Sequence, residues 1–166
     1  MNSPLYSQAE LEEAHKSILS TLCKCEKKYI KEYDAMHQEY RISTPREDLY
    51  NITPQVREAI SQSGVQSGIA VVFCPHTTAA ITINENADPD VVHDILLGLD
   101  KAFLDRPEFR HGEGNSAAHL KASAMGSSVT IIIQNGKPLL GTWQGVYFCE
   151  FDAPRNRTFY VKVQPG

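Results

Sequence analysis

The sequence predicts an α+β fold built mainly from antiparallel sheets, with a few helices and an N-terminal helical extension. Segments with the composition of strands outnumber those with the periodicity of helices, and several follow one another directly along the chain. Asn135-Gly136 lies between two apolar runs, and this dipeptide is the strongest short-range signal for a β-hairpin. These observations favour antiparallel sheet over a parallel, doubly wound sheet, in which strands and helices alternate.

The first 35 residues predict an amphipathic helix. Ser7 and Glu10 have the spacing of a capping box, and apolar side chains then recur every three or four residues over about 8–32. Such a stripe usually packs on its own domain or on a neighbouring subunit, so we assign it no chemistry. The chain is therefore divided into a helical extension over residues 1–35 and one domain over residues 36–166.

Short apolar segments separated by turn residues predict the elements of this domain. Strands are expected over 37–44, 68–74, 79–86 and 158–164, with a hairpin around 135–136 and helices that begin at Thr53-Pro54 and Asp88-Pro89. The strands over 68–74 and 79–86 are joined through Pro75, His76 and Thr77. Five apolar residues form the inner face of the second helix: Val92, Ile95, Leu96, Leu99 and Phe103.

Composition and charge exclude several classes of protein. A chain of 166 residues with 42% hydrophobic and 22% charged residues is typical of one ordinary globular domain. Its formal net charge of −4 makes nucleic acid an unfavourable main partner. The start of the chain lacks the pattern of a secretory signal, and no apolar run reaches the about 18 residues of a membrane span. We therefore expect a cytoplasmic protein without a membrane partner.

The four cysteines form neither a disulfide framework nor a zinc knuckle. They are interpreted as reduced thiols, with Cys74 and Cys149 buried in strands. Cys23-Lys24-Cys25 remains a minor candidate for a soft-metal site.

Four of the six histidines, His76, His93, His111 and His119, lie between residues 76 and 119, each near the predicted end of an element. His111 and His119 fall in a glycine-containing segment that is interpreted as an exposed loop. Neutral imidazole is the commonest protein ligand for zinc and similar ions, and carboxylates nearby complete such a shell. Each histidine taken alone is more often a solvated side chain, so both interpretations stay open at this point.

A second group of polar residues lies in the segment GTWQGVYFCEFDAPR, residues 141–155. Its polar side chains either line a cleft or form the solvent face of an edge strand; they are Thr142, Gln144, Glu150 and Asp152. Arg155 and Arg157 follow, and arginines there either bind phosphate or form surface ion pairs.

The segments HTTAAITINENADPDVVHD and GTWQGVYFCEFDAPR, with the loop over 111–123, together resemble the YjbQ family, now often labelled secondary thiamine-phosphate synthase. The resemblance runs from about Tyr40 to Val163, and residues 1–35 lie outside it. It implies sheets packed as a sandwich, a homotrimer, and a metal-binding cleft between subunits. The residues that match the family's motifs are His76, His93, His111, His119 and Glu85, whereas His15 and His37 match nothing.

The resemblance implies an activity that joins hydroxymethylpyrimidine diphosphate to thiazole phosphate. A divalent ion, zinc or magnesium, and cationic groups would stabilise the leaving diphosphate. The four matching histidines are the expected metal ligands, and Glu85 and Asp94 the expected catalytic carboxylates. The residues expected to bind a small, phosphorylated substrate are Thr77, Thr78, Lys121, Thr142, Gln144 and Arg155.

This implied activity does not fit every feature of the expected site. A magnesium–diphosphate site usually has paired carboxylates, whereas this one is rich in histidine. Two alternatives therefore stay open: a metal-dependent hydrolase with Glu85 as general base, and a trimeric metal- or ligand-binding protein without catalysis.

Overall fold

The computed structural model describes residues 12–13, 15–24 and 37–166. The chain separates into two compact units, Met1–Met36 and His37–Gly166. In the first unit the described residues are helical, and Ile18, Leu19 and Leu22 are exposed. The predicted capping box, Cys25 and the rest of the apolar stripe lie outside the described residues. No helix in the described part of the chain is long and apolar enough to cross a membrane.

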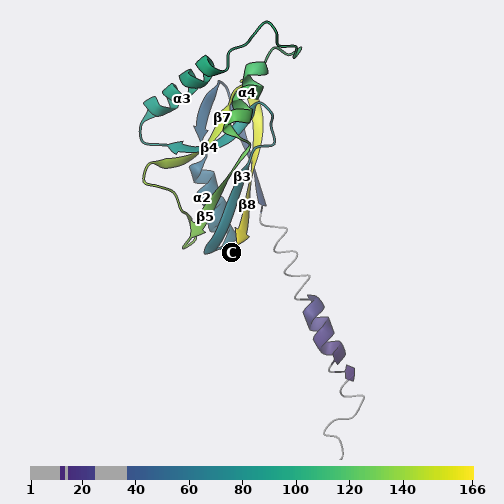
Figure 1. The fold of residues 1–166 in the computed structure, drawn as a ribbon. Coiled ribbons are helices and arrows are strands. Elements are labelled where there is room, and N and C mark those ends of the chain that lie inside the picture. The colour runs from purple at the N-terminus through teal and green to yellow at the C-terminus, as the bar shows by residue number, and fades with distance from the viewer. Residues whose placement is uncertain (1–11, 14, 25–36) are drawn as a thin grey trace, which may run out of the picture. The chain divides into compact units, whose positions relative to one another are not determined.

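Residues 37–166 form two antiparallel sheets packed as a sandwich, with three helices (Figure 1). In spatial order, the five-stranded sheet contains β1 (His37–Thr44), β8 (Arg155–Pro165), β3 (Ser67–Phe73), β5 (Ser128–Gln134) and β6 (Lys137–Pro138). The three-stranded sheet contains β2 (Asp48–Asn51), β7 (Gln144–Glu150) and β4 (Ala79–Glu85). The helices are α2 (Thr53–Ser63), α3 (Pro89–Ala102) and α4 (Ser116–Met125). The predicted α+β fold with antiparallel sheets is confirmed.

The predicted turn and both predicted helix starts are confirmed, although Ile52 and not Thr53 is the N-cap of α2. Strands β5 and β6 pair across Asn135-Gly136, whose φ angles of 53° and 70° are those of a tight hairpin turn. Helix α2 has its proline in the first turn and ends at Gly64 with φ 70°. Helix α3 begins after Asp88, whose side chain accepts a hydrogen bond from the backbone N–H of Asp90.

Strands β3 and β4 follow each other in sequence but lie in different sheets. β3 pairs with β5 and β8, whereas β4 pairs with β7. The segment between them, residues 74–78, therefore carries the chain from one sheet to the other, and we call it the crossing segment. It contains His76, Thr77 and Thr78. This crossing brings His76 beside β8.

The segment expected to be a loop around His119 is helical, and this expectation was wrong. Residues 116–125 form α4, so His119 is held on a helix, while His111 stays in the preceding loop. Alanine, leucine, lysine and methionine in this segment favour helix. Its apolar residues follow no clear 3.6-residue period, and Gly112 and Gly114 just before it gave the segment the composition of a loop. Strand β2, with only four residues, was also missed.

Strand β7 is buried along nearly all its length and divides the interior into two layers. The side chains of Val146, Phe148 and Glu150 lie on one face of β7 and fill part of the space between the two sheets. Tyr147 and Cys149 share the other face, in a cluster with Leu49, Ala80, Ala118, Ala122 and Phe151. Four predicted inner-face residues of α3 pack against this cluster: Val92, Ile95, Leu96 and Leu99. Cys74 and Cys149 are buried, as predicted, and burial raises the pKa of both thiols.

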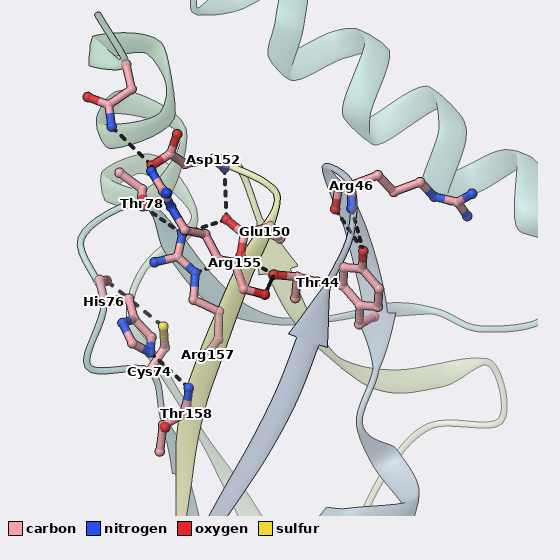
Figure 2. A network of polar contacts seen from close by, with 12 residues as sticks. Thr44, Arg46, Cys74, His76, Thr78, Glu150, Asp152, Arg155, Arg157 and Thr158 are labelled. Atoms are coloured by element: carbon pink, nitrogen blue, oxygen red, sulfur yellow. Dashed lines mark hydrogen bonds and ion pairs between the residues drawn. The ribbon is translucent and has the colours of Figure 1, made fainter. Parts of the chain in front are cut away.

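A buried ion pair links the two sheets (Figure 2). Glu150 on β7 is fully buried and accepts two hydrogen bonds from the Arg157 guanidinium on β8, at 2.7 Å from Nε and 2.6 Å from Nη2. The carboxylate also accepts from the Thr44 hydroxyl and the backbone N–H of Asp152, each at 2.8 Å. Because both charges are paired and hydrogen-bonded, their burial is tolerated.

Replacing Glu150 with glutamine should strongly destabilise the protein, because Arg157 would remain buried without its counter-charge. We expect a loss of about 3–5 kcal/mol in the free energy of unfolding, measured by urea denaturation. The matched control is Arg155→Gln, which removes the exposed guanidinium that pairs with Asp152 and should cost far less. Equal losses in the two variants would contradict the role given to the buried pair.

The same pair predicts a dependence of stability on pH. Burial alone would raise the pKa of Glu150, but the hydrogen bonds from Arg157, Thr44 and the Asp152 amide outweigh it and lower the pKa below its ordinary value of 4.5. The resulting stabilisation is present above pH 4.5 and is lost as the pH falls through the folded-state pKa. Unfolding measured between pH 7 and pH 3 should therefore show a shallower loss of stability in Glu150→Gln than in the wild type.

Candidate functional site

Helix α4 and the loop before it bring His111 and His119 together. Their ring centroids lie 5.1 Å apart, with the ring planes at 78°. The two rings line a cavity of about 410 Å³ together with Phe109, Ser116 and Leu120. Two imidazoles that were eight residues apart in sequence therefore share one opening.

His119 also lines a second cavity, of about 540 Å³, on the side of the crossing segment. The residues around it are His76, Thr77, Ala79, His119, Ala122, Ser123, Gly126 and Ser127. Hydroxyl groups and imidazoles thus dominate its polar lining. We call these two cavities, which share His119, the histidine cavities. They contain three of the four histidines that the sequence singled out.

Two hydrogen bonds, one from Arg157 of the ion pair and one from its neighbour Thr158, hold the crossing segment in place (Figure 2). Arg157 Nη2 donates to the hydroxyl of Thr78 at 2.8 Å, which holds that side chain in the interior. The next residue on β8, Thr158, donates its backbone N–H to His76 Nε2 at 2.9 Å. The buried Thr78 is therefore a structural contact of Arg157, whereas Thr77 is exposed at the rim of the cavity.

His93 and the two predicted catalytic carboxylates lie elsewhere. His93 lines a separate cavity of about 540 Å³, which is bordered by Arg46, Asp48, Asn86 and Tyr147 among others. Its Nδ1 lies 3.1 Å from Asp94 Oδ1, and both side chains are exposed. Glu85 ends β4, where its backbone oxygen accepts from the Tyr147 hydroxyl, and it lines neither histidine cavity.

The predicted cationic substrate ligands are already paired with carboxylates. Lys121 Nζ lies 2.5 Å from Glu47 Oε1 and 2.5 Å from Asp100 Oδ1, and only 5% of its side chain is exposed. It faces a cavity of about 420 Å³ that contains neither His111 nor His119. Arg155 pairs with Asp152 at 2.8 Å. Neither cation lines a histidine cavity.

Thr142 and Gln144, the remaining predicted substrate ligands, lie in and just after the exposed turn before β7. The Gln144 side-chain oxygen accepts from the backbone N–H of Gly141 at 2.8 Å. This contact stabilises the turn, and neither residue lines a histidine cavity. Most of the predicted substrate-binding residues therefore lie away from the histidine cavities, and Thr77 is the one that lines a histidine cavity.

Three features around the histidines were missed from the sequence. Ser123 lies one helical turn after His119 on α4, a spacing that identifies it once 116–125 is known to be helical. Ser127 lines the same cavity from the end of the connection to β5. Glu113 Oε2 lies 3.9 Å from His111 Nε2. Within the described residues, no three histidine, cysteine or acidic side chains form a group that could hold a metal ion.

Comparison with known proteins identifies the family. A family model described as UPF0047 protein YjbQ-like matches residues 38–166. The chain belongs to the YjbQ/UPF0047 family. A UPF0047 protein of Methanocaldococcus jannaschii is 59% identical over 125 residues, which are 75% of this chain and 91% of the relative. Bacillus subtilis YugU is 52% identical over 122 residues, which are 73% and 92% of the two chains.

Solved structures of family members have the same fold. A YjbQ/UPF0047 protein of Clostridium acetobutylicum is 59% identical, with a TM-score of 0.75 over 76% of this chain and 99% of that one. A protein of Sulfolobus solfataricus is 31% identical, with a TM-score of 0.75 over 78% and 96%. The first is described as uncharacterised and the second as of unknown function. The resemblance seen in the sequence is thus confirmed for the family and its fold.

The position of Lys121 predicts a structural role. Lys121→Met keeps the packing of the stem but removes both ion pairs, and the partly exposed Glu47 and Asp100 are then free to rehydrate. We therefore expect a loss of about 1–2 kcal/mol in the free energy of unfolding, measured by urea denaturation. The control, Lys101→Met at an exposed position of α3, should change it by less than about 0.5 kcal/mol. Unchanged stability in Lys121→Met would indicate that the lysine is held for binding rather than for structure.

Proposed function

We propose that this protein is a metal-dependent enzyme in which His111 and His119 bind a zinc-type divalent ion. The observation that carries the proposal is the 5.1 Å separation of their ring centroids. Two imidazoles whose nitrogens lie about 2.0–2.1 Å from one tetrahedral zinc ion have ring centroids roughly 5 Å apart. Imidazole nitrogen also suits zinc better than magnesium, which prefers oxygen ligands.

Such an ion would polarise a substrate oxygen and lower the pKa of a bound water to about 7. His111 and His119 would hold it at the boundary between the two histidine cavities. Glu113, whose Oε2 lies 3.9 Å from His111 Nε2, would supply the carboxylate that accepts a proton from the bound water. Glu85 and Asp94 line neither histidine cavity, so a role for either one requires a neighbouring copy to bring it to the ion.

We propose a homotrimer with shared sites as the working assembly. Catalytic zinc sites typically have three protein ligands and one open position, and the described part of one chain offers two neighbouring imidazoles. A surface suited to self-association is present on the outer face of the five-stranded sheet. There Ile69 and Ile132 are partners in register, with Phe73 further along the same face of β3, and all three are exposed.

The reaction that the site supports best is hydrolysis of a small molecule, with water as the nucleophile. Transfer with a diphosphate leaving group needs free cationic groups around it, and Lys121 and Arg155 are both occupied by carboxylates. Formation of thiamine phosphate, the activity implied by the family label, remains a second candidate. It is supported by the hydroxyl groups of Thr77, Ser123 and Ser127, which suit a phosphate group beside His119.

Metal analysis tests the first step. In protein purified without a metal-affinity tag, His111→Ala and His119→Ala should each lose most of the bound divalent metal while their circular dichroism stays that of the wild type. His93→Ala, which alters an exposed histidine in another cavity, should retain the metal. Unchanged metal content in both His111→Ala and His119→Ala would sink the proposal.

Turnover then separates an enzyme from a binding protein. A screen of phosphate esters, carboxylic esters and amides, together with the two thiamine precursors, should reveal an activity that is lost on chelation and restored by zinc. Metal binding without any metal-dependent turnover across the screen would favour the non-catalytic alternative.

Assembly gives an independent prediction. Light scattering of the wild type should give about three times the chain mass of 18.5 kDa. Ile132→Lys places a charge in the apolar patch and should shift the protein toward monomers. A wild-type monomer at micromolar concentration would contradict shared sites.

A further inference from the structure

We infer that His76 is a neutral hydrogen-bond donor to an anionic oxygen of the ligand, with its proton held on Nδ1 by the backbone of Thr158, and that it is not a metal ligand. This changes the role that the sequence predicted for His76. The inference rests on the proposed function only for the statement that a ligand enters the histidine cavities.

The hydrogen bond from Thr158 determines the tautomer. A backbone N–H can only donate, so His76 Nε2, 2.9 Å away, must be the acceptor and carries no proton. A neutral imidazole has one N–H group, which must therefore be on Nδ1. A metal ion binds an imidazole at a nitrogen without a proton, and here that nitrogen is already used. Zinc could take it only by leaving the Thr158 N–H without an acceptor.

The surroundings of His76 favour the neutral ring. Burial and the nearby Arg157 guanidinium lower its pKa below the ordinary value of 6.5, and they outweigh the Thr158 backbone and Glu150, which act in the opposite direction. Arg157 is itself fixed by Glu150 and by its hydrogen bond to Thr78. Two residues near His76 are thus held by the same ion pair. Thr78, two residues further along the chain, is held through its side chain, and Thr158, which donates to the ring, directly follows Arg157 on β8. Glu150 and Arg157 act as positioning residues for His76.

The Nδ1–H group is available to a ligand. In the described part of the chain Nδ1 has no hydrogen-bond partner, and His76 is only half-buried. The ring lines the cavity of about 540 Å³ that also contains Thr77, Ser123 and Ser127. A fixed N–H beside three hydroxyl groups suits an acceptor with several oxygens, such as a phosphate or a carboxylate. The ligand would then have its anionic group at His76 and its next atoms at His119.

Nitrogen NMR on the full-length, metal-free protein with labelled histidine and backbone tests the tautomer. We expect the proton of His76 on Nδ1, an unprotonated Nε2, and a coupling across the hydrogen bond between Nε2 and the Thr158 amide nitrogen. Addition of zinc should shift the ring signals of His111 and His119 and leave the His76 tautomer and its coupling intact. A proton on Nε2, or loss of the coupling with zinc, would overturn the inference.

The zinc titration distinguishes the proposed metal site at His111 and His119 from the role assigned to His76. If zinc leaves His111 and His119 unchanged, the proposed metal site fails while the assignment of His76 stands. If zinc shifts all three rings and removes the coupling to Thr158, the metal site stands and the assignment of His76 fails. The tautomer measurement uses the wild-type protein, so it stays decisive even if a variant does not fold.

Anion binding tests the role of the N–H group. Inorganic phosphate and acetate, titrated separately into the metal-free protein, distinguish a phosphate from a carboxylate ligand, and at least one should shift the His76 Nδ1–H signal to saturation. His76→Ala should weaken that binding about tenfold or more, the loss expected for one hydrogen bond to a charged group. His76→Asn, whose amide N–H lies near the position of Nδ1, should bind within a few-fold of the wild type. Unchanged affinity in His76→Ala, or a His76 signal that responds to neither anion, would overturn this role.

Discussion

The ion pair between Glu150 and Arg157 is the constraint on which the arrangement of this domain depends. The two residues lie on consecutive strands that belong to different sheets, so the pair fixes how the sheets meet. Two charges buried this deeply are tolerated only when their hydrogen-bonding capacity is used, and the partners that use it are Thr44 and Thr78 in addition to the backbone of Asp152. The chain around the histidine cavities is thereby connected to the centre of the sandwich.

This connection explains why a site near the surface can have a defined geometry. His76 is held through Thr158, and β4, which follows it, pairs with the buried strand β7. On the other side His119 is carried by α4, whose Ala118 and Ala122 pack into the cluster beneath the three-stranded sheet. Side chains held on rigid elements keep their orientation better than side chains on free loops. Of the three histidines that line these cavities, His111 lies on the loop before α4 and is therefore held least firmly.

The sequence predicted those parts of the fold that depend on neighbouring residues. Asn135-Gly136, Thr53-Pro54 and Asp88-Pro89 each act within a few residues, and each gave the expected turn or helix start. The separation of β3 and β4 into two sheets depends on distant strands, which no local signal reveals. Helix α4 was missed because its apolar residues lack a clear helical period and follow two glycines.

The candidate site was predictable to a similar degree. The clustering of histidines in sequence pointed to His76, His111 and His119, which the structure does place around shared cavities. The pairing of Lys121 could not be seen in the same way, because Glu47 and Asp100 are 74 and 21 residues away along the chain. Whether a cation is free to bind substrate depends on such distant partners, and so does the tautomer of His76.

X-ray absorption at the zinc edge, on protein purified without a metal-affinity tag, tests the central claim most directly because it reports the atoms bound to the metal. The account predicts a shell of nitrogen and oxygen at about 2.0–2.1 Å, with the outer-shell scattering of at least two imidazole rings. His93→Ala should leave that spectrum unchanged. A shell that contains sulfur at about 2.3 Å, or one without imidazole, would place the metal away from His111 and His119 and contradict the account.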